Sequence, residues 1–242
     1  MPDGSILVIG GASGFGRAVA RHLAREGRAV HVTSRDEKKA ASVAADLAEE
    51  TGTFVAGHAV DVMDADALAD LLGTVAAEGP LAHVVSTAGG ASAGGFLDGS
   101  LDDVLGPVRD KFEAGLRLAR AAAPLLAEGG SLTLTAGAGG KPHQAAGAVL
   151  GNADLRMLVQ GLAVELAPRV RVNAVAPGWT VTPLWRDLDP ADVEATRRAI
   201  SAQVPLGRTA TVEEVAAAFL FLLGNGFVTG QTLTVDGGWE LV

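Results

Sequence analysis

Three closely spaced glycines near the start of the chain, Gly10, Gly14 and Gly16, have the types and spacing of a phosphate-binding loop. They follow the apolar run Ile6–Ile9 and open a segment from Arg17 to Glu26 that we expect to be helical. Side chains at these positions would keep a pyrophosphate away from the backbone N–H groups at a helix N-terminus. In a chain with 32 glycines such a triplet can be a plain tight turn, but its place between a strand and a helix favours a dinucleotide site.

The residues after the second predicted strand indicate which dinucleotide would bind. An acidic residue at the position of Ser34 would bind the adenosine ribose hydroxyls and repel a 2′-phosphate. Here Ser34 is followed by Arg35, whose guanidinium can neutralise that phosphate and stack on the adenine. This pattern favours NADP(H) over NAD(H). The alternative is that Arg35 is a solvated residue in front of a helix that Asp36 caps.

These residues need a sheet to position them, and seven short runs rich in β-branched residues can supply its strands. The runs are Ile6–Ile9, Ala29–Thr33, Thr53–His58, Ala82–Ser86, Ser131–Thr135, Val170–Val175 and Gln231–Val235. Alanine-rich segments with apolar residues at three- and four-residue spacing separate most of them. The pattern predicts an α/β fold, a doubly wound seven-stranded parallel sheet (Rossmann fold) with helices on both faces. Its ligand crevice would lie at the carboxyl ends of the strands.

Composition narrows the class of protein. A chain of 242 residues, 48% of them hydrophobic, can form one large core, so we expect a single domain over residues 1–242. The net charge of -9 and the lack of basic clusters argue against nucleic-acid binding. There is no cysteine, and the five histidines are too widely spaced to suggest a metal site. No apolar run approaches the length of a membrane span, so a cytoplasmic protein is the expectation.

Further motifs occur in a fixed order along the chain. They are Gly10-xxx-Gly14-Phe15-Gly16, Asp61-Val62, Ala88-Gly89, Arg171-Val172-Asn173-Ala174-Val175-Ala176-Pro177-Gly178 and Thr229-Gly230-Gln231…Val235-Asp236-Gly237-Gly238. Each motif is weak on its own. Together they resemble the classical short-chain dehydrogenase/reductase family over essentially the whole chain. The resemblance implies a nicotinamide-dependent oxidoreductase that acts on a small-molecule substrate.

The resemblance also implies a set of cofactor-binding residues. They are Gly10, Ser13, Gly14, Phe15, Gly16, Ser34, Arg35, Asp61, Val62, Ala88, Gly89, Pro177, Gly178, Thr180 and Thr182. Asp61 and Val62 would hold the adenine, and Ala88 and Gly89 would lie against a cofactor ribose. Pro177 and Gly178 would turn the chain under the nicotinamide, with Thr180 and Thr182 at its carboxamide and the phosphates. The family usually has Asn-Asn-Ala-Gly where this chain has Ser86-Thr87-Ala88-Gly89.

The chain contains no tyrosine, although this family uses a serine, a tyrosine and a lysine, with an upstream asparagine, to transfer a proton. Alignment through Ala163–Pro168 places the tyrosine position at Ala148 and the lysine position at Asn152. The asparagine position falls on Lys111. The serine position is Thr135 or Gly137, of which only Thr135 could donate a hydrogen bond.

Three residues could replace the missing acid: Thr135, Lys111 and His143. A desolvated Lys111 could act as an acid, a base or an electrostatic stabiliser, or it could be a surface lysine in a charged run. His143 lies in the predicted wall of the substrate pocket, and an imidazole can transfer protons near neutral pH, but an exposed loop histidine is the simpler interpretation. A solvated helix face would explain Asp154 and Arg156.

Three functions remain open from the sequence. The first is an NADP(H)-dependent oxidoreductase with an altered proton-transfer site, the second a lyase or isomerase on the same scaffold, and the third a cofactor-binding pseudoenzyme. The substrate pocket would be walled by Gly90–Gly99, Lys141–Ala148 and Trp179–Trp185. The two tryptophans suggest an aromatic or apolar substrate, or they pack within the lid itself. We expect this lid to run from Gly178 to about Pro205.

The resemblance also implies assembly. The segments Phe112–Ala127 and Ala153–Ala167 are similar to the two long helices through which the family forms dimers. The segment Thr229–Val242 is similar to the one that completes tetramers. A homotetramer is therefore expected first and a homodimer second.

Overall fold

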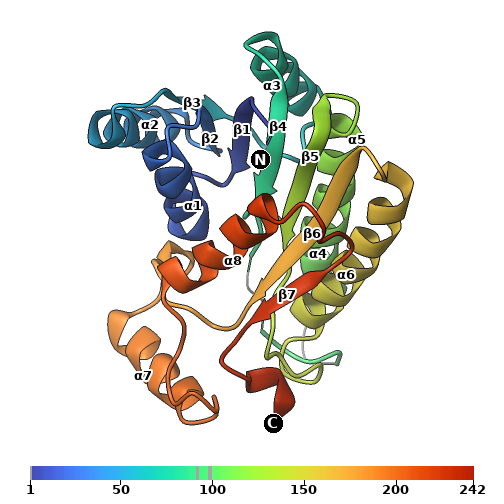
Figure 1. Ribbon diagram of the computed structural model, residues 1–242. Coiled ribbons are helices and arrows are strands. Elements are labelled where there is room, and N and C mark those ends of the chain that lie inside the picture. The colour runs from blue at the N-terminus through green and yellow to red at the C-terminus, as the bar shows by residue number, and fades with distance from the viewer. Residues whose placement is uncertain (1, 91–92, 98–99) are drawn as a thin grey trace.

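The computed structural model describes residues 2–90, 93–97 and 100–242, and its strands form one parallel sheet. The strands are β1 Ser5–Ile9, β2 Val30–Ser34, β3 Val55–Ala59, β4 Leu81–Ser86, β5 Leu126–Thr135, β6 Val170–Pro177 and β7 Thr232–Val235. Their order across the sheet is β3-β2-β1-β4-β5-β6-β7 (Figure 1). The predicted doubly wound seven-stranded sheet is confirmed.

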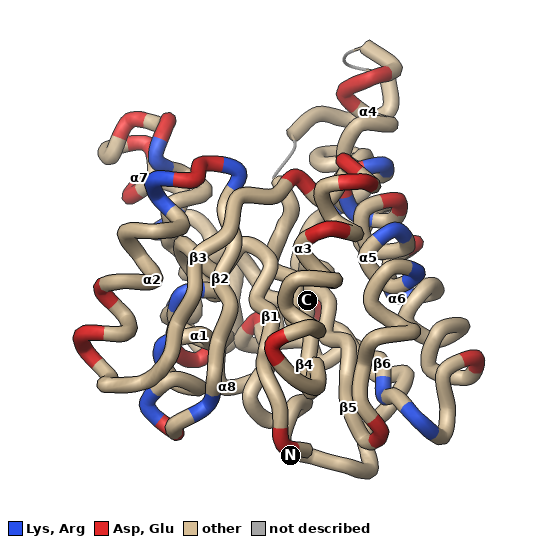
Figure 2. The backbone as a smooth tube through the Cα atoms, turned by 90° about the horizontal axis from the view of Figure 1, so that it is seen from above, with Lys and Arg blue, Asp and Glu red and all other residues tan. Residues whose placement is uncertain are grey.

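Helices cover both faces of the sheet. The helices are α1 Gly14–Arg25, α2 Glu37–Thr51, α3 Ala65–Ala77, α4 Leu101–Val108, α5 Ala114–Ala122, α6 Ala146–Leu166, α7 Pro190–Ser201 and α8 Val212–Gly224. One apolar core joins α1, α2 and α8 to the sheet, and the second joins α3, α5 and α6 to the opposite face. Most charged residues lie on helices and loops, although β5 carries Glu128 and β6 carries Arg171, whereas β1 and β4 at the centre carry no Lys, Arg, Asp or Glu (Figure 2).

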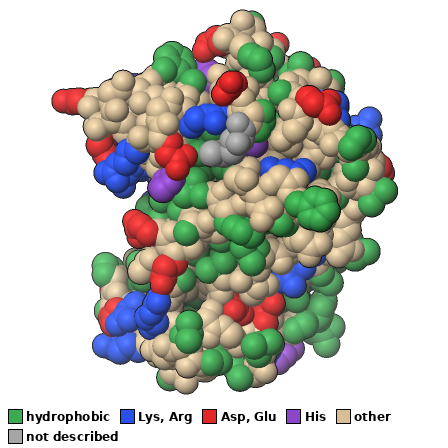
Figure 3. Space-filling view, viewed as in Figure 1, with side chains coloured by type: hydrophobic (Ala, Val, Ile, Leu, Met, Phe, Trp, Pro, Cys, Tyr) green, Lys and Arg blue, Asp and Glu red, His purple; other side chains and the backbone are tan. Residues whose placement is uncertain are grey.

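The chain reverses its winding direction between β1 and β4. These adjacent strands are separated in sequence by β2 and β3, so the loops that follow β1 and β4 diverge at the carboxyl edge of the sheet. A doubly wound sheet opens its ligand crevice at such a point. In the space-filling view the surface is hollowed between the regions that carry α1 and α7 (Figures 1 and 3).

Local sequence explains where several helices begin. The Asp36 carboxylate accepts a hydrogen bond from the Lys39 N–H at the start of α2, and Asp64 accepts from Asp66 and Ala67 at the start of α3. The Asp36 cap agrees with the sequence analysis. The predicted helical segment Phe112–Ala127 is wrong at its end, because α5 stops at Ala122 and β5 begins at Leu126.

A π-helical turn, η1, covers Arg109–Glu113 and connects α4 to α5. It follows Pro107, which lies inside α4 and has no backbone N–H to donate. A π turn contains one residue more than an α-helical turn and changes the direction of the side chains that follow it. Lys111 is the central residue of this turn.

The motif at the start of β6 holds the end of the fold together. The Arg171 guanidinium donates hydrogen bonds to the carbonyl oxygens of Leu222 and Leu223 at the C-terminus of α8. The Asn173 side chain donates to the Val228 carbonyl at 2.9 Å and accepts from the Gln231 N–H at 3.0 Å. These residues therefore fix the connection between α8 and β7 and lie away from the crevice.

Candidate active site

The glycine loop after β1 is folded so tightly that two of its positions cannot hold a side chain. A Cβ on Gly16 would lie 2.5 Å from the Gly10 carbonyl oxygen and 2.6 Å from the Thr87 hydroxyl. A Cβ on Gly10 would lie 2.8 Å from the same hydroxyl, and Gly10 has a φ of 75°. Gly14 has a φ of 50°, and a Cβ there would make only ordinary van der Waals contacts, the shortest 3.7 Å to the Thr182 Cβ. The loop therefore needs glycine for packing at Gly16 and for backbone conformation at Gly14.

The N-terminus of α1 offers an anion-binding position. Ser13 is its N-cap residue but makes no side-chain capping bond, and the first turn carries no acidic residue. Phe15 packs against the core below. The first N–H groups of α1 point out of the helix and have no partner within it, so they and the Ser13 hydroxyl fit a pyrophosphate.

Thr87, which follows β4, supports this loop from the side. Its hydroxyl lies 3.2 Å from the Ile9 carbonyl and 3.4 Å from the Gly10 carbonyl, so it links the ends of β1 and β4. Ala88 packs on the core, and Gly89 has a φ of 156°. The sequence analysis did not identify Thr87 as a supporting residue. Thr87, at the position where the resemblance implies an asparagine, thus links the two loops.

The residues predicted to bind the adenosine lie after β2 and after β3. The Ser34 hydroxyl accepts a hydrogen bond from the Asp36 N–H, and Asp61 accepts one from the Met63 N–H at 2.9 Å. Val62 is buried beside Asp61. The Arg35 side chain is exposed and makes no hydrogen bond or ion pair with any described residue. It is therefore available to a ligand.

The lid lies close to the glycine loop. The position of a Cβ on Gly14 is 3.7 Å from the Thr182 Cβ, and Thr182 itself caps a short 3-10 helix, Pro183–Trp185. Thr180 is buried, and its hydroxyl donates to the Gly178 carbonyl. Pro177 ends β6 immediately before this turn. The segment from Gly178 to about Pro205 contains loops, this short helix and α7, as expected, and its role as a lid stays a prediction.

The two lid tryptophans pack on each other. The rings of Trp179 and Trp185 are stacked with centroids 5.4 Å apart, and the Trp185 indole N–H donates to the Thr180 carbonyl. Of the two interpretations given by the sequence, this arrangement matches packing within the lid.

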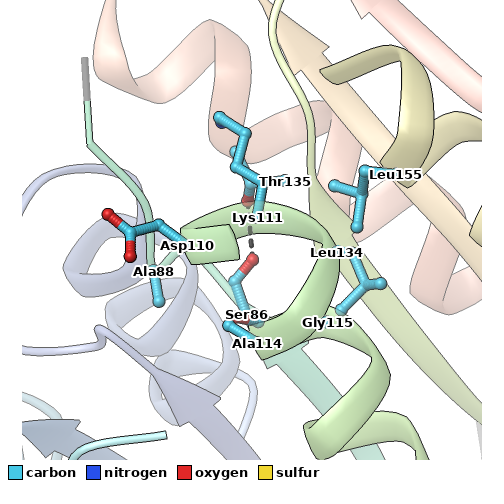
Figure 4. Close-up of a pocket in the computed structure, with 9 residues that line it drawn as sticks. All are labelled: Ser86, Ala88, Asp110, Lys111, Ala114, Gly115, Leu134, Thr135 and Leu155. Atoms are coloured by element: carbon cyan, nitrogen blue, oxygen red, sulfur yellow. Dashed lines mark hydrogen bonds between the residues drawn. The ribbon is translucent and has the colours of Figure 1, made fainter. Parts of the chain in front are cut away.

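Lys111 and Thr135 line the same small cavity at the carboxyl end of the sheet. Its volume is about 10 Å³ and its polar lining comes from Ser86, Asp110, Lys111 and Thr135. The Thr135 hydroxyl donates a 2.6 Å hydrogen bond to the Ser86 carbonyl, drawn as the dashed line in Figure 4. The other walls are apolar and include Leu134 and Leu155. A cavity of this size holds about one water molecule.

The Lys111 side chain is half-buried, and it runs past two glycines, Gly151 and Gly89. Its Cδ lies 3.3 Å from where a Cβ on Gly151 would be, and its Nζ lies 3.5 Å from where a Cβ on Gly89 would be. Burial lowers the pKa of Lys111 from 10.5 to about 8, although the nearby Asp110 carboxylate opposes this shift. Lys111 is therefore not the surface lysine that was the alternative in the sequence analysis.

The structure does not bring His143 to this cavity. It is exposed in the turn before α6 and is not among the residues that line the Lys111 cavity. Ala148 and Asn152 lie on α6 as the alignment expected. A Cβ on Gly137 would lie 2.8 Å from the Asn152 amide nitrogen, so the Asn152 side chain packs against the loop after β5.

Arg156 has more than the solvated role given to it by the sequence analysis. Its guanidinium donates to the Gly137 carbonyl at 3.2 Å and forms an ion pair with Glu240 at 2.9 Å. The Trp239 ring covers Gly139 in the same loop. The loop after β5 is thus held between α6 and the segment that follows β7. Only the three-dimensional proximity of residues more than 80 positions apart reveals this contact.

Comparison with known proteins agrees with this arrangement. Residues 10–240 match a family described as enoyl-(acyl carrier protein) reductase. The chain belongs to the short-chain dehydrogenase/reductase family. It is 32% identical to carbonyl reductase family member 4 of Danio rerio over 98% of both chains. It is 31% identical to a tropinone reductase homolog of Arabidopsis thaliana, over 97% of this chain and 91% of that protein.

Solved structures of the family superpose closely on this fold. A small-chain dehydrogenase in complex with NADPH matches 100% of both chains with a TM-score of 0.82 and 30% identity. This short-chain dehydrogenase/reductase is therefore an oxidoreductase by family, and its glycine-lined site fits a nicotinamide cofactor. In the part of the chain that the structure describes, no helix is long and apolar enough to span a membrane.

Proposed function

We propose that the chain is an NADP(H)-dependent oxidoreductase that uses Lys111 and Thr135 in place of the family's tyrosine and lysine. The observation that carries the proposal is the half-buried Lys111 amine against Gly89, in one cavity with Thr135. A bound nicotinamide would supply the hydride chemistry. The proteins of similar sequence named above include reductases, and one similar structure holds NADPH.

The preference for NADP(H) rests on Arg35. The side chain is unpaired and exposed at the end of β2, beside Ser34 instead of an acidic residue. A guanidinium there can form charge-assisted hydrogen bonds to a 2′-phosphate. The Ser13 hydroxyl and the N-terminus of α1 would bind the pyrophosphate, and Asp61 and Val62 the adenine.

Residues of the cavity lined by Lys111 and Thr135 would carry out the proton chemistry at the substrate. With a pKa of about 8, Lys111 can hold or release a proton near neutral pH. The Thr135 proton is engaged with the Ser86 carbonyl, so its hydroxyl oxygen can accept but its proton is not free. We therefore expect Lys111 to stabilise the negative charge that develops on the substrate. We expect the Thr135 hydroxyl oxygen to accept a hydrogen bond that orients the substrate. His143 remains a candidate only if its loop moves.

Titration with NADPH and NADH tests the cofactor assignment. We expect NADPH to bind at least tenfold more tightly, and Arg35→Asp to reverse or abolish this preference, while the distant Arg120→Asp variant does not. Equal affinities of the wild-type chain for both nucleotides would contradict the role of Arg35. Failure of either nucleotide to bind at millimolar concentration would contradict the proposed function as a whole.

Turnover separates this proposal from its two alternatives. We expect oxidation of NADPH with one or more compounds of an aldehyde, enone and imine panel, and loss of that activity in Lys111→Ala. A lyase or isomerase would convert substrate with no change in absorbance near about 340 nm, the reduced-nicotinamide band. A pseudoenzyme would bind NADPH and turn over none of the panel.

We also propose that the chain assembles through α6. Leu150, Met157 and Val164 are exposed and spaced by seven residues, which places them on one face of the helix. Such a stripe on a long helix suits pairing with a second copy by two-fold symmetry. Size-exclusion chromatography with light scattering should give a dimer or tetramer, and Met157→Glu should shift it toward the monomer.

A further inference from the structure

The Lys111 amine has a setting unlike that of the other lysines in the sequence, Lys38, Lys39 and Lys141. Those three side chains are exposed. Lys111 is half-buried, and within the described residues its nitrogen forms neither a hydrogen bond nor an ion pair. A partly buried ammonium group without a hydrogen-bond or ion-pair partner is unusual, because desolvation favours the neutral amine.

The surroundings of Lys111 define the path of its side chain. Its stem passes Gly151 on α6, and its nitrogen reaches Gly89 at the end of β4. Figure 4 shows the Lys111 side chain beside Thr135. Leu134 and Leu155 form the apolar wall of the cavity. A side chain on Gly89 or Gly151 would meet the lysine, so both glycines leave room for it.

From this geometry we propose that Lys111 is a covalent catalytic residue that forms an imine with the carbonyl carbon of an aldehyde substrate. The inference rests on the proposed function for the position of the substrate but not for the covalent step. A desolvated lysine amine that forms no ion pair is the kind of group that enzymes use for this reaction. Thr135, whose hydroxyl oxygen can accept a hydrogen bond, lines the same cavity as this amine.

The step balances without a further reactant. The neutral amine adds to the carbonyl carbon, and the C–O bond of the resulting carbinolamine then breaks while C=N forms. Relative to the ammonium form, two protons leave the nitrogen and depart with the oxygen as water, and one proton stays on the nitrogen. Hydrolysis reverses the sequence and releases the aldehyde.

Imine formation would explain how the site manages without tyrosine. A protonated imine carries on nitrogen the positive charge that a carbonyl oxygen obtains only from an acid. Its chemistry lies at the neighbouring carbons, because the C–N bond must remain hydrolysable for turnover. The substrate class is therefore aldehydes that react at the carbon next to the carbonyl or at a conjugated double bond.

Reductive trapping tests the proposal on the wild-type protein. Propanal and cyanoborohydride at pH 7 should convert the imine to a stable N-propyl adduct, which peptide mass spectrometry locates. With a pKa of about 8, about one tenth of Lys111 is free amine at this pH, roughly 300-fold more than for an ordinary lysine. We expect Lys111 to be labelled on the order of 10²-fold faster than Lys38, Lys39 and Lys141.

Lys111→Arg is the matched control, because it keeps the positive charge but cannot form the imine. It should lose the fast adduct while circular dichroism and NADPH affinity remain close to those of the wild type. Labelling of Lys111 no faster than the exposed lysines would overturn the proposal. Trapping at Lys111 in a protein that binds no nicotinamide would leave this inference standing and refute the proposed function instead.

Discussion

Replacing Lys111 with methionine should make the folded protein more stable at neutral pH. The lysine stem already lies against Gly151 and beside the apolar wall of the cavity, so an unbranched apolar side chain can occupy the same path. What the substitution removes is the desolvated charge, since no described residue forms an ion pair with it. As a residue retained for function, Lys111 is thus expected to lower the stability of the folded protein.

The magnitude follows from the pKa. Each tenfold change in a protonation equilibrium corresponds to about 1.4 kcal/mol, so a pKa lowered from 10.5 to about 8 corresponds to at most about 3 kcal/mol. Because Lys111 is only half-buried, solvent screening reduces this figure, and we expect a gain of about 1–3 kcal/mol at pH 7. The folded-state pKa is below the unfolded one, so the cost is fully present below pH 8 and vanishes as the pH rises toward 10.5.

Urea denaturation at pH 7 and pH 10 measures this effect. The free energy of unfolding of Lys111→Met should exceed that of the wild type at pH 7, and the difference should largely disappear at pH 10. Lys141→Met, at an exposed lysine, is the control and should change stability by less than about 0.5 kcal/mol at both pH values. A Lys111→Met protein less stable than the wild type at pH 7 would refute the reasoning.

Three further perturbations have defined outcomes. His83 is fully buried, and its Nδ1 lies 2.8 Å from the Ser131 hydroxyl. Burial lowers the pKa of His83 to about 3. The free energy of unfolding should therefore fall by on the order of 4 kcal/mol as the pH drops from 6.5 toward 3. Thermal denaturation of the His83→Leu/Ser131→Ala double variant should lack that pH dependence, and an unchanged slope would contradict the assignment. Gly16→Ala should abolish NADPH binding because its Cβ would lie 2.5 Å from the Gly10 carbonyl oxygen. Gly14→Ala should cost only about 1 kcal/mol of backbone strain. Similar NADPH affinities of the two variants would count against this distinction. Arg156→Ala should speed hydrogen exchange in residues 136–141 more than Arg120→Ala does, since it removes the contacts to Gly137 and Glu240.

The strands could be predicted because each is a short apolar run with its own local signal. All seven were found within one or two residues, except that β5 begins five residues before Ser131. Its extra residues, Leu126–Gly130, contain two glycines and read as a turn. They are held in the sheet by tertiary contacts, including the hydrogen bond from the Gly129 N–H to the Arg169 carbonyl. A local pattern carries no information about such partners.

The site was predictable only in part, for a similar reason. Motif spacing located the glycine loop and aligned Lys111 with the asparagine position, and Lys111 and Thr135 do share a cavity. The sequence left the burial of Lys111 open, because burial depends on Gly89 and Gly151, which lie on two other elements. Arg156 and Thr87 were missed because their partners are distant in sequence. Charge alone suggested solvent for Arg156, and the fold placed a carbonyl and a carboxylate beside it instead.

The direction in which the Lys111 side chain points depends on the number of residues in the π turn at Arg109–Glu113. An α-helix advances about 100° per residue, so deleting one residue from this turn would rotate the preceding helix by that angle relative to α5. The same lysine would then no longer reach Gly89. A lineage could gain or lose this amine by a single-codon insertion or deletion, with every side chain of the site unchanged. Relatives are therefore better compared by helix length between Ser100 and Ala122 than by residue identity at the aligned column.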